Sequence, residues 1–168
     1  DLLGDLGAHN ARAHGDHANP IRWSRQALAD SDGEIRAIVL NSAGANCFTG
    51  QFGYETSELT ASETATLLGS VPTSVQVCST GLIGEGGEAF RAAILDSLPS
   101  LVESASPEGG LAAANAILTT DTHAKTTSYT SPQGWSIGGI AKGAGMLAPG
   151  LATMLVVLTT DAVLTAGE

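Results

Sequence analysis

Apolar and polar positions along the chain form short β-branched runs separated by longer stretches of helical composition. Two apolar runs, IRAIVLN at 35–41 and SVQVC at 74–78, predict strands because β-branched residues fill them and turn residues bound them. The segments predicted to be helical are 21–28, 54–68, 88–98 and 110–118. Strands toward both ends of the chain, with helices between them, predict a layered α/β fold and not an all-α bundle.

The last third of the chain predicts a hairpin followed by one more strand. KTTSYT at 125–130 and GWSIGGIAKG at 134–143 form the hairpin, joined through SPQ. After a turn at Pro149 and Gly150, the run from Met154 to Leu158 reads as a short, fully buried strand. Thr153 stands between turn and strand, either as an ordinary strand residue or as a nucleophile held where a loop meets the core.

The first twenty residues have no clear period and are predicted to be irregular. Three of the four histidines lie there, His9, His14 and His17, together with Asp5 and Asp16. They could share a metal only if this Gly- and Asn-containing segment were helical, so a solvated terminus is the favoured interpretation. His123 stands apart and is predicted to be structural.

Composition limits the classes of partner. Hydrophobic residues make up 43% of the 168-residue chain and charged residues 14%, with 21 glycines, which indicates one loop-rich globular domain. A net charge of −10 without a basic cluster disfavours a nucleic-acid partner. No apolar stretch reaches the length of a membrane span, and no signal peptide is recognised. Cys47 and Cys78 lack metal-ligand spacing, so we expect two buried, reduced thiols and a cytoplasmic protein.

Three glycine-rich loops follow predicted strands: NSAGAN, CSTGLIG and AKGAGMLAPG. Glycine leaves backbone N–H groups uncovered, which suits oxyanion binding, although a tight turn is the commoner role of any one such loop. GAGMLA matches a dinucleotide fingerprint only formally, because Pro149 stands where the phosphate-binding helix would run. Lys142 is one of two cations after Arg91 and is either a surface lysine or a partner for a substrate carboxylate.

Threonine acts as a nucleophile when its own α-amine serves as the base, since that amine titrates near neutral pH. For Thr153 this requires a cut of the chain directly after Ala152. Attack of the hydroxyl on the preceding carbonyl gives an ester that water opens. A small preceding residue and a turn are compatible with that reaction, but the pattern alone leaves the ordinary strand residue as the more frequent case.

GWSIGGIAKGAGMLAPGLATMLVVLTTDA strongly resembles the self-cleavage region of the ornithine acetyltransferase family, also called bifunctional glutamate N-acetyltransferase. That family carries K-G-x-G-M-x-x-P-x-x-A-T-M-L. CSTGLIG and AILTTDT resemble its two other signature loops, and IRAIVLNSAGANCFTG is similar to its upstream strand and Asn/Gly loop. The resemblance extends from about Ile21 to Leu164. One departure is Ala43, which stands where glycine is expected.

The resemblance implies that a precursor cuts itself between Ala152 and Thr153. Thr153 then takes an acetyl group from N-acetylornithine and passes it to glutamate in a ping-pong reaction of arginine biosynthesis. The family's other site positions match four residues here. Thr80 and Gly81 match its oxyanion hole, and Thr119 and Lys142 match positions that bind substrate together with Thr153.

The resemblance also implies an architecture of two β-sheets between helical layers, of which this chain is the N-terminal half. It divides the chain into a poorly specified segment 1–20, an α-chain-like domain 21–152 and the start of a β-chain-like segment 153–168. It further implies an α2β2 heterotetramer without metal or prosthetic group, and it leaves open acetyl-CoA as an additional donor. We expect this piece alone to be inactive.

Two other functions stay open. A related N-terminal-nucleophile amidase or aminopeptidase would let water take the acyl group where the transferase uses an amine. An inactive, truncated relative would serve only in binding or assembly and would keep the bond before Thr153 intact.

Overall fold

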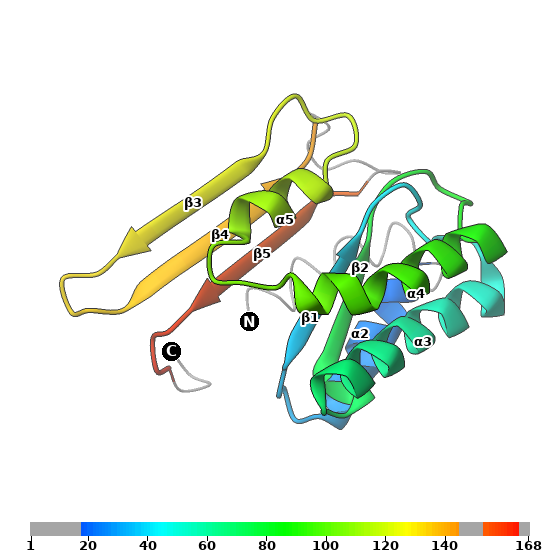
Figure 1. Ribbon diagram of the computed structural model, residues 1–168, viewed down its shortest axis with the longest axis horizontal. Helices are drawn as coiled ribbons and strands as arrows, with labels where there is room; N and C mark the ends of the chain where they lie inside the picture. The colour runs from blue at the N-terminus through cyan, green and yellow to red at the C-terminus, as the bar shows by residue number, and fades with distance from the viewer. Residues whose placement is uncertain (1–17, 145–152, 165–168) are drawn as a thin grey trace.

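The computed structural model describes residues 18–144 and 153–164, which form two sheets with helices packed on them (Figure 1). The first sheet is parallel and contains β1 (Ala37–Asn41) and β2 (Val75–Ser79); the second is antiparallel and contains β3 (Lys125–Thr130), β4 (Ser136–Lys142) and β5 (Leu155–Thr160). The helices are α2 (Asn19–Asp30), α3 (Gly50–Leu68), α4 (Glu88–Glu103) and α5 (Gly110–Ala116), with a 3-10 turn η2 (Pro72–Ser74). The predicted layered α/β class is confirmed.

The main core lies between the parallel sheet and helices α2, α3 and α4. Val39 of β1 stands opposite Val77 of β2, and α3 forms the crossover between the two strands. The buried cluster consists of Trp23, Ala27, Val39, Ala61, Ala65, Val75, Val77 and Leu98. Three of these eight side chains are alanines on helices α2 and α3, and their small size allows these helices to pack close to the strands.

Side chains of helix α2 form hydrogen bonds with backbone groups along the edge of β2 that does not pair with β1. The Ser24 hydroxyl donates to the Val77 carbonyl and accepts from the Val77 N–H, both at 3.0 Å. The Trp23 indole Nε1 donates to the Val75 carbonyl at 3.1 Å. Unpaired strand edges invite association with other chains, and these two side chains occupy the groups that would otherwise be open.

Helix α3 is rich in hydroxyl residues, which lowers its intrinsic helix propensity. In the structure the hydroxyls of Thr56, Thr60 and Thr64 each donate to the carbonyl four residues earlier, at 2.7 to 3.0 Å. These bonds allow a stripe of small polar residues to be buried against neighbouring helices without unpaired groups. The helix ends at Gly69, which adopts the left-handed conformation with φ of 62°.

Helix α4 is longer than predicted. Its predicted end was Leu98, just before Pro99, yet the helix continues to Glu103. A proline inside a helix removes one backbone hydrogen bond, and burial of Leu98 (1% exposed) holds the two halves of the helix on the core. Conversely, α5 ends two residues earlier than predicted, at Ala116.

The predicted hairpin and last strand are confirmed, and β4 pairs with both β3 and β5. The expectation of a fully buried last strand is wrong, because Val156 is 48% and Leu158 67% exposed. Alternate residues of a strand point to opposite faces. Val157 lines a hollow shared with Leu111 of α5, whereas no element among the described residues covers the face of Val156 and Leu158.

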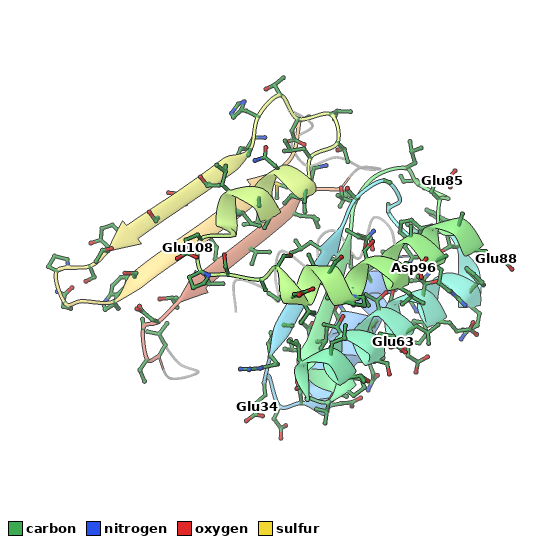
Figure 2. All side chains as sticks on the ribbon, viewed as in Figure 1. Glu34, Glu63, Glu85, Glu88, Asp96 and Glu108 are labelled. Carbon is green, nitrogen blue, oxygen red and sulfur yellow. The ribbon has the colours of Figure 1, made fainter. Side chains whose placement is uncertain are left out.

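Acidic side chains lie on the outside of the helical layer. Figure 2 labels Glu63 on α3 and Glu88 and Asp96 on α4, and all three are exposed. The two thiols are less alike than predicted: Cys47 is buried, but Cys78 is only partly so. Burial raises the pKa of both, which suits unreactive thiols.

No helix in the described ranges is long and apolar enough to cross a membrane.

Candidate active site

One pocket of about 670 Å³ lies where the two sheets meet. Its walls come from the loops after β1, β2 and α5, from the end of β4 and from the residues before β5. The lining residues include Thr80, Gly81, Thr119, Lys142 and Thr153. Five of the six predicted site residues therefore share one pocket although they are spread over the sequence. The sixth, Ala152, lies outside the described residues.

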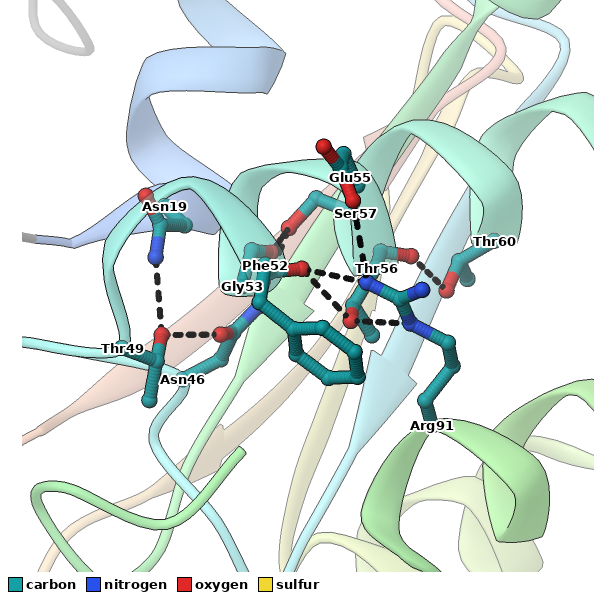
Figure 3. A network of polar contacts seen from close by, with 10 residues as sticks. All are labelled: Asn19, Asn46, Thr49, Phe52, Gly53, Glu55, Thr56, Ser57, Thr60 and Arg91. Atoms are coloured by element: carbon teal, nitrogen blue, oxygen red, sulfur yellow. Dashed lines mark hydrogen bonds and ion pairs between the residues drawn. The ribbon is translucent and has the colours of Figure 1, made fainter. Parts of the chain in front are cut away.

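The loop after β1 is anchored by a buried polar network around Asn46 (Figure 3). Asn46 Nδ2 donates to the Gly53 carbonyl at 2.8 Å and to Ser57 Oγ at 3.2 Å, while Oδ1 accepts from Thr49 Oγ1 at 2.7 Å. Asn19 Nδ2 in turn donates to Thr49 Oγ1 at 2.8 Å. These bonds tie the loop to the start of α3 and so fix the wall that the loop contributes to the pocket.

The loops after β1 and β2 are joined directly. Leu82 N–H donates to the Ala43 carbonyl at 2.8 Å, and Ala45 N–H donates to the Leu82 carbonyl at 2.9 Å. Gly81 has a φ of +135°, and a Cβ added there would lie 2.1 Å from the Ala43 carbonyl oxygen. Only glycine fits this position, so the close approach of the two loops depends on it.

Ala43 has a φ of 82°, the left-handed region that favours glycine. This agrees with the expectation of glycine at this position. We predict that Ala43→Gly raises the free energy of unfolding by about 0.5–1 kcal/mol, because relief of the strained φ exceeds the added freedom of the unfolded chain. Chemical denaturation measures this, with Ala112→Gly in exposed α5 as the control that should destabilise; a loss of stability in Ala43→Gly would contradict the strain.

Thr80 and Gly81 present two hydrogen-bond donors to the pocket. Thr80 is fully buried, and its N–H donates to the Asn41 carbonyl at 3.0 Å, so only its hydroxyl remains for a ligand. The Gly81 N–H has no hydrogen-bond partner within the part of the chain that the structure describes. A hydroxyl and an amide donor at one place can stabilise a developing oxyanion, and the assignment of this role to Thr80 and Gly81 stays a prediction.

Lys142 is buried, with 4% exposure, so the surface-lysine alternative is wrong. Its Nζ donates to Thr119 Oγ1 at 2.6 Å and to Thr80 Oγ1 at 3.1 Å. The ammonium thus connects two predicted site residues from separate loops. Its binding of a substrate carboxylate stays a prediction.

Asp121 is a member of this cluster that the sequence analysis did not single out. Its side chain is fully buried; Oδ1 accepts from Lys125 Nζ at 2.5 Å and from Gly143 N–H at 2.7 Å, and Oδ2 lies 3.7 Å from Lys142 Nζ. Burial by itself raises the pKa of Asp121, but the hydrogen bonds from Lys125 and Gly143 and the two lysine charges outweigh it and lower the pKa to about 2. A usable signal was present, since Lys125 follows four residues after the acid in LTTDTHAK.

The lowered pKa of Asp121 predicts an acid-sensitive contribution to stability. A carboxyl whose pKa falls from 3.8 to about 2 on folding stabilises the protein above the higher value and loses that effect as the pH drops through the lower one. We therefore expect Asp121→Asn to lower the melting temperature at pH 7, and the difference from wild type to shrink between about pH 4 and pH 2. Asp96→Asn on exposed α4 is the control, and a pH-independent difference for Asp121→Asn would contradict the assignment.

The layered α/β fold that carries this pocket is also the fold of a solved ornithine acetyltransferase and of a solved ArgJ protein. The solved ornithine acetyltransferase from Mycobacterium tuberculosis, complexed with ornithine, matches with a TM-score of 0.71 and 36% identity over 82% of this chain and 72% of that chain. The ArgJ protein of Bacillus halodurans matches with a TM-score of 0.65 and 29% identity over 84% of this chain and 73% of that one.

The chain belongs to the ArgJ family, whose model matches residues 13–168. It is 50% identical over 153 residues to the arginine biosynthesis bifunctional protein ArgJ of Bifidobacterium longum, covering 90% of this chain and 38% of that protein. It is 51% identical over 148 residues to the protein of the same name from Thermobifida fusca, covering 88% of this chain and 37% of that protein. The predicted family is confirmed, and the chain spans less than two fifths of the length of these curated relatives.

Proposed function

We propose that the protein containing this chain is an acetyltransferase of arginine biosynthesis that moves acetyl from N-acetylornithine to glutamate. The observation that carries the proposal is the single pocket in which Thr153 lies with Thr80, Gly81, Thr119 and Lys142. Membership of the ArgJ family supports the same activity, as does the likeness to an ornithine acetyltransferase complexed with ornithine.

The first chemical step is activation of Thr153 by self-cleavage. The Thr153 hydroxyl attacks the Ala152 carbonyl carbon, the peptide C–N bond breaks, and an ester joins the two segments. Water then hydrolyses the ester. The products are a free carboxylate on Ala152 and a free α-amine on Thr153, and that amine is the base the hydroxyl needs.

The second step is acetyl transfer through Thr153. The hydroxyl passes its proton to the α-amine and attacks the acetyl carbonyl of N-acetylornithine; the oxyanion so formed accepts hydrogen bonds from the Thr80 hydroxyl and the Gly81 N–H. The acetyl C–N bond breaks, and the proton moves to the departing ornithine amine. The amine of glutamate then attacks the acetyl ester and restores the threonine. The threonine itself carries the acetyl group, so the proposal includes no cofactor.

Thr119 and Lys142 are proposed to hold the substrates. An ammonium beside two hydroxyls suits the carboxylate that both amino-acid substrates carry. Acetyl-CoA is included as an additional donor, because the relatives are named bifunctional. The assembly proposed is a cytoplasmic α2β2 heterotetramer of the two self-cleaved halves.

The proposal is tested on the full-length protein by denaturing intact mass and by transfer of labelled acetyl. We expect two fragments with a break between residues 152 and 153, and acetylglutamate formed only when glutamate is present. Release of acetate at the same rate with or without glutamate would identify an amidase instead. A single uncut mass with no transfer would indicate an assembly subunit.

A further inference from the structure

We propose that Asp121 is a positioning residue that holds the Lys142 ammonium beside Thr80 and Thr119. With the ammonium there, the hydroxyl hydrogens of both threonines point away from it, and the hydrogen of Thr80 points into the pocket. The effect on rate rests on the proposed acetyl transfer; the positioning itself does not. Asp121 is not among the residues that line the pocket, so its action must pass through Lys142.

The direction of the hydroxyl hydrogens follows from the chemistry of the ammonium. A lysine ammonium has three donors and no acceptor, so a hydroxyl bonded to it must be the acceptor. Thr80 Oγ1 and Thr119 Oγ1 both accept from Lys142 Nζ. Each hydroxyl then keeps its own hydrogen for another partner, and Thr80 faces the pocket where the oxyanion would form. A hydroxyl that accepts from a cation is also a stronger donor.

Asp121 is placed to hold the ammonium in that position. Its Oδ1 is anchored by Lys125 Nζ and by the N–H of Gly143, the residue next to Lys142. Its Oδ2 has no hydrogen bond among the described residues and lies 3.7 Å from Lys142 Nζ. One carboxylate therefore fixes the backbone beside Lys142 and faces its charge, and a buried ammonium requires such a partner.

This arrangement predicts different effects on rate and on substrate binding. Asp121→Asn removes a negative charge beside the pocket, so the carboxylate of the substrate should be held at least as well as before. The orientation of the Thr80 hydroxyl is lost, so the acetylation rate should fall. A residue that served substrate binding alone would show the opposite pattern.

The experiment measures single-turnover acetylation of the full-length protein by N-acetylornithine. For Asp121→Asn we expect a rate about 10- to 100-fold lower, with the half-saturating concentration unchanged or reduced. Asp96→Asn, the same change at an exposed carboxylate of α4 outside the pocket, should stay within about 3-fold of wild type. An unchanged rate in Asp121→Asn, or an equal loss in Asp96→Asn, would overturn the positioning role.

Two further measurements keep the inference decidable. If Asp121→Asn does not fold, the double variant Asp121→Asn with Lys142→Met removes both buried charges. Its acetylation rate should equal that of Lys142→Met alone. A lower rate in the double variant would show that Asp121 acts independently of Lys142. Crystal structures of the wild type and of whichever Asp121 variant folds provide a readout without activity. In Asp121→Asn, Lys142 Nζ should leave hydrogen-bond distance of Thr80 Oγ1, and its retention there would overturn the inference. A wild type that positions Lys142 as described but transfers no acetyl would overturn only the proposed function.

Discussion

Thr153→Ala is expected to leave the full-length protein as one uncut chain without detectable acetyl transfer, a loss of about 10⁴-fold or more. The variant lacks the hydroxyl that both self-cleavage and transfer require. Thr153 lies in the same pocket as the donor pair Thr80 and Gly81, so its hydroxyl can serve as the nucleophile without another nucleophile among the described residues. Denaturing mass spectrometry and an acetyl-transfer assay report the two reactions separately.

Two controls make the loss specific to this hydroxyl. Thr159→Ala removes an exposed hydroxyl of β5, outside the pocket, and should leave both reactions unchanged. Thr153→Ser keeps a hydroxyl and should retain some cleavage. Acetyl transfer that persists in Thr153→Ala would show that Thr153 is not the nucleophile, whether or not the chain is cleaved.

Thr80→Val should lower the acetylation rate by about 10²- to 10³-fold, the usual effect of losing one oxyanion donor. Valine has nearly the same shape as threonine, and Thr80 is fully buried, so the fold should tolerate the change. Only the hydroxyl is lost, since the Thr80 N–H is already bonded to the Asn41 carbonyl. The buried Lys142 ammonium loses one acceptor, which costs about 1.5–3 kcal/mol of stability.

Thr80→Ser provides the matched control because it restores the hydroxyl without the methyl group, and its rate should stay within about 10-fold of wild type. The rate constant of acetylation is the decisive measurement, taken beside the half-saturating concentration and the melting temperature. If Thr80→Val acetylates at the wild-type rate, the oxyanion is stabilised by other donors. If only the half-saturating concentration rises, the hydroxyl binds the ground state instead.

Local patterns in the sequence determined the elements and several of the site residues. The runs at 35–41 and 74–78 became β1 and β2, because β-branched residues between turn residues have few alternatives to a strand. The hairpin of β3 and β4 followed from two such runs around a short turn. The isolated Lys142 in an apolar, glycine-rich stretch indicated a special environment, and it is buried.

Tertiary structure alone decided which of these residues meet and which surfaces are covered. The position of Asp121 beside Lys142 depends on β3 and β4 pairing in register, with Lys125 opposite Ala141, and no local pattern carries that information. The exposure of β5 was missed because an apolar run is the same whether or not another element covers that face of the sheet; only the neighbouring elements distinguish the two cases. Continuation of α4 past Pro99 likewise depended on burial of Leu98. Local propensity acts over a few residues, whereas packing and charge pairing act between segments far apart in the chain, so the sequence indicated the parts of the site and the fold assembled them.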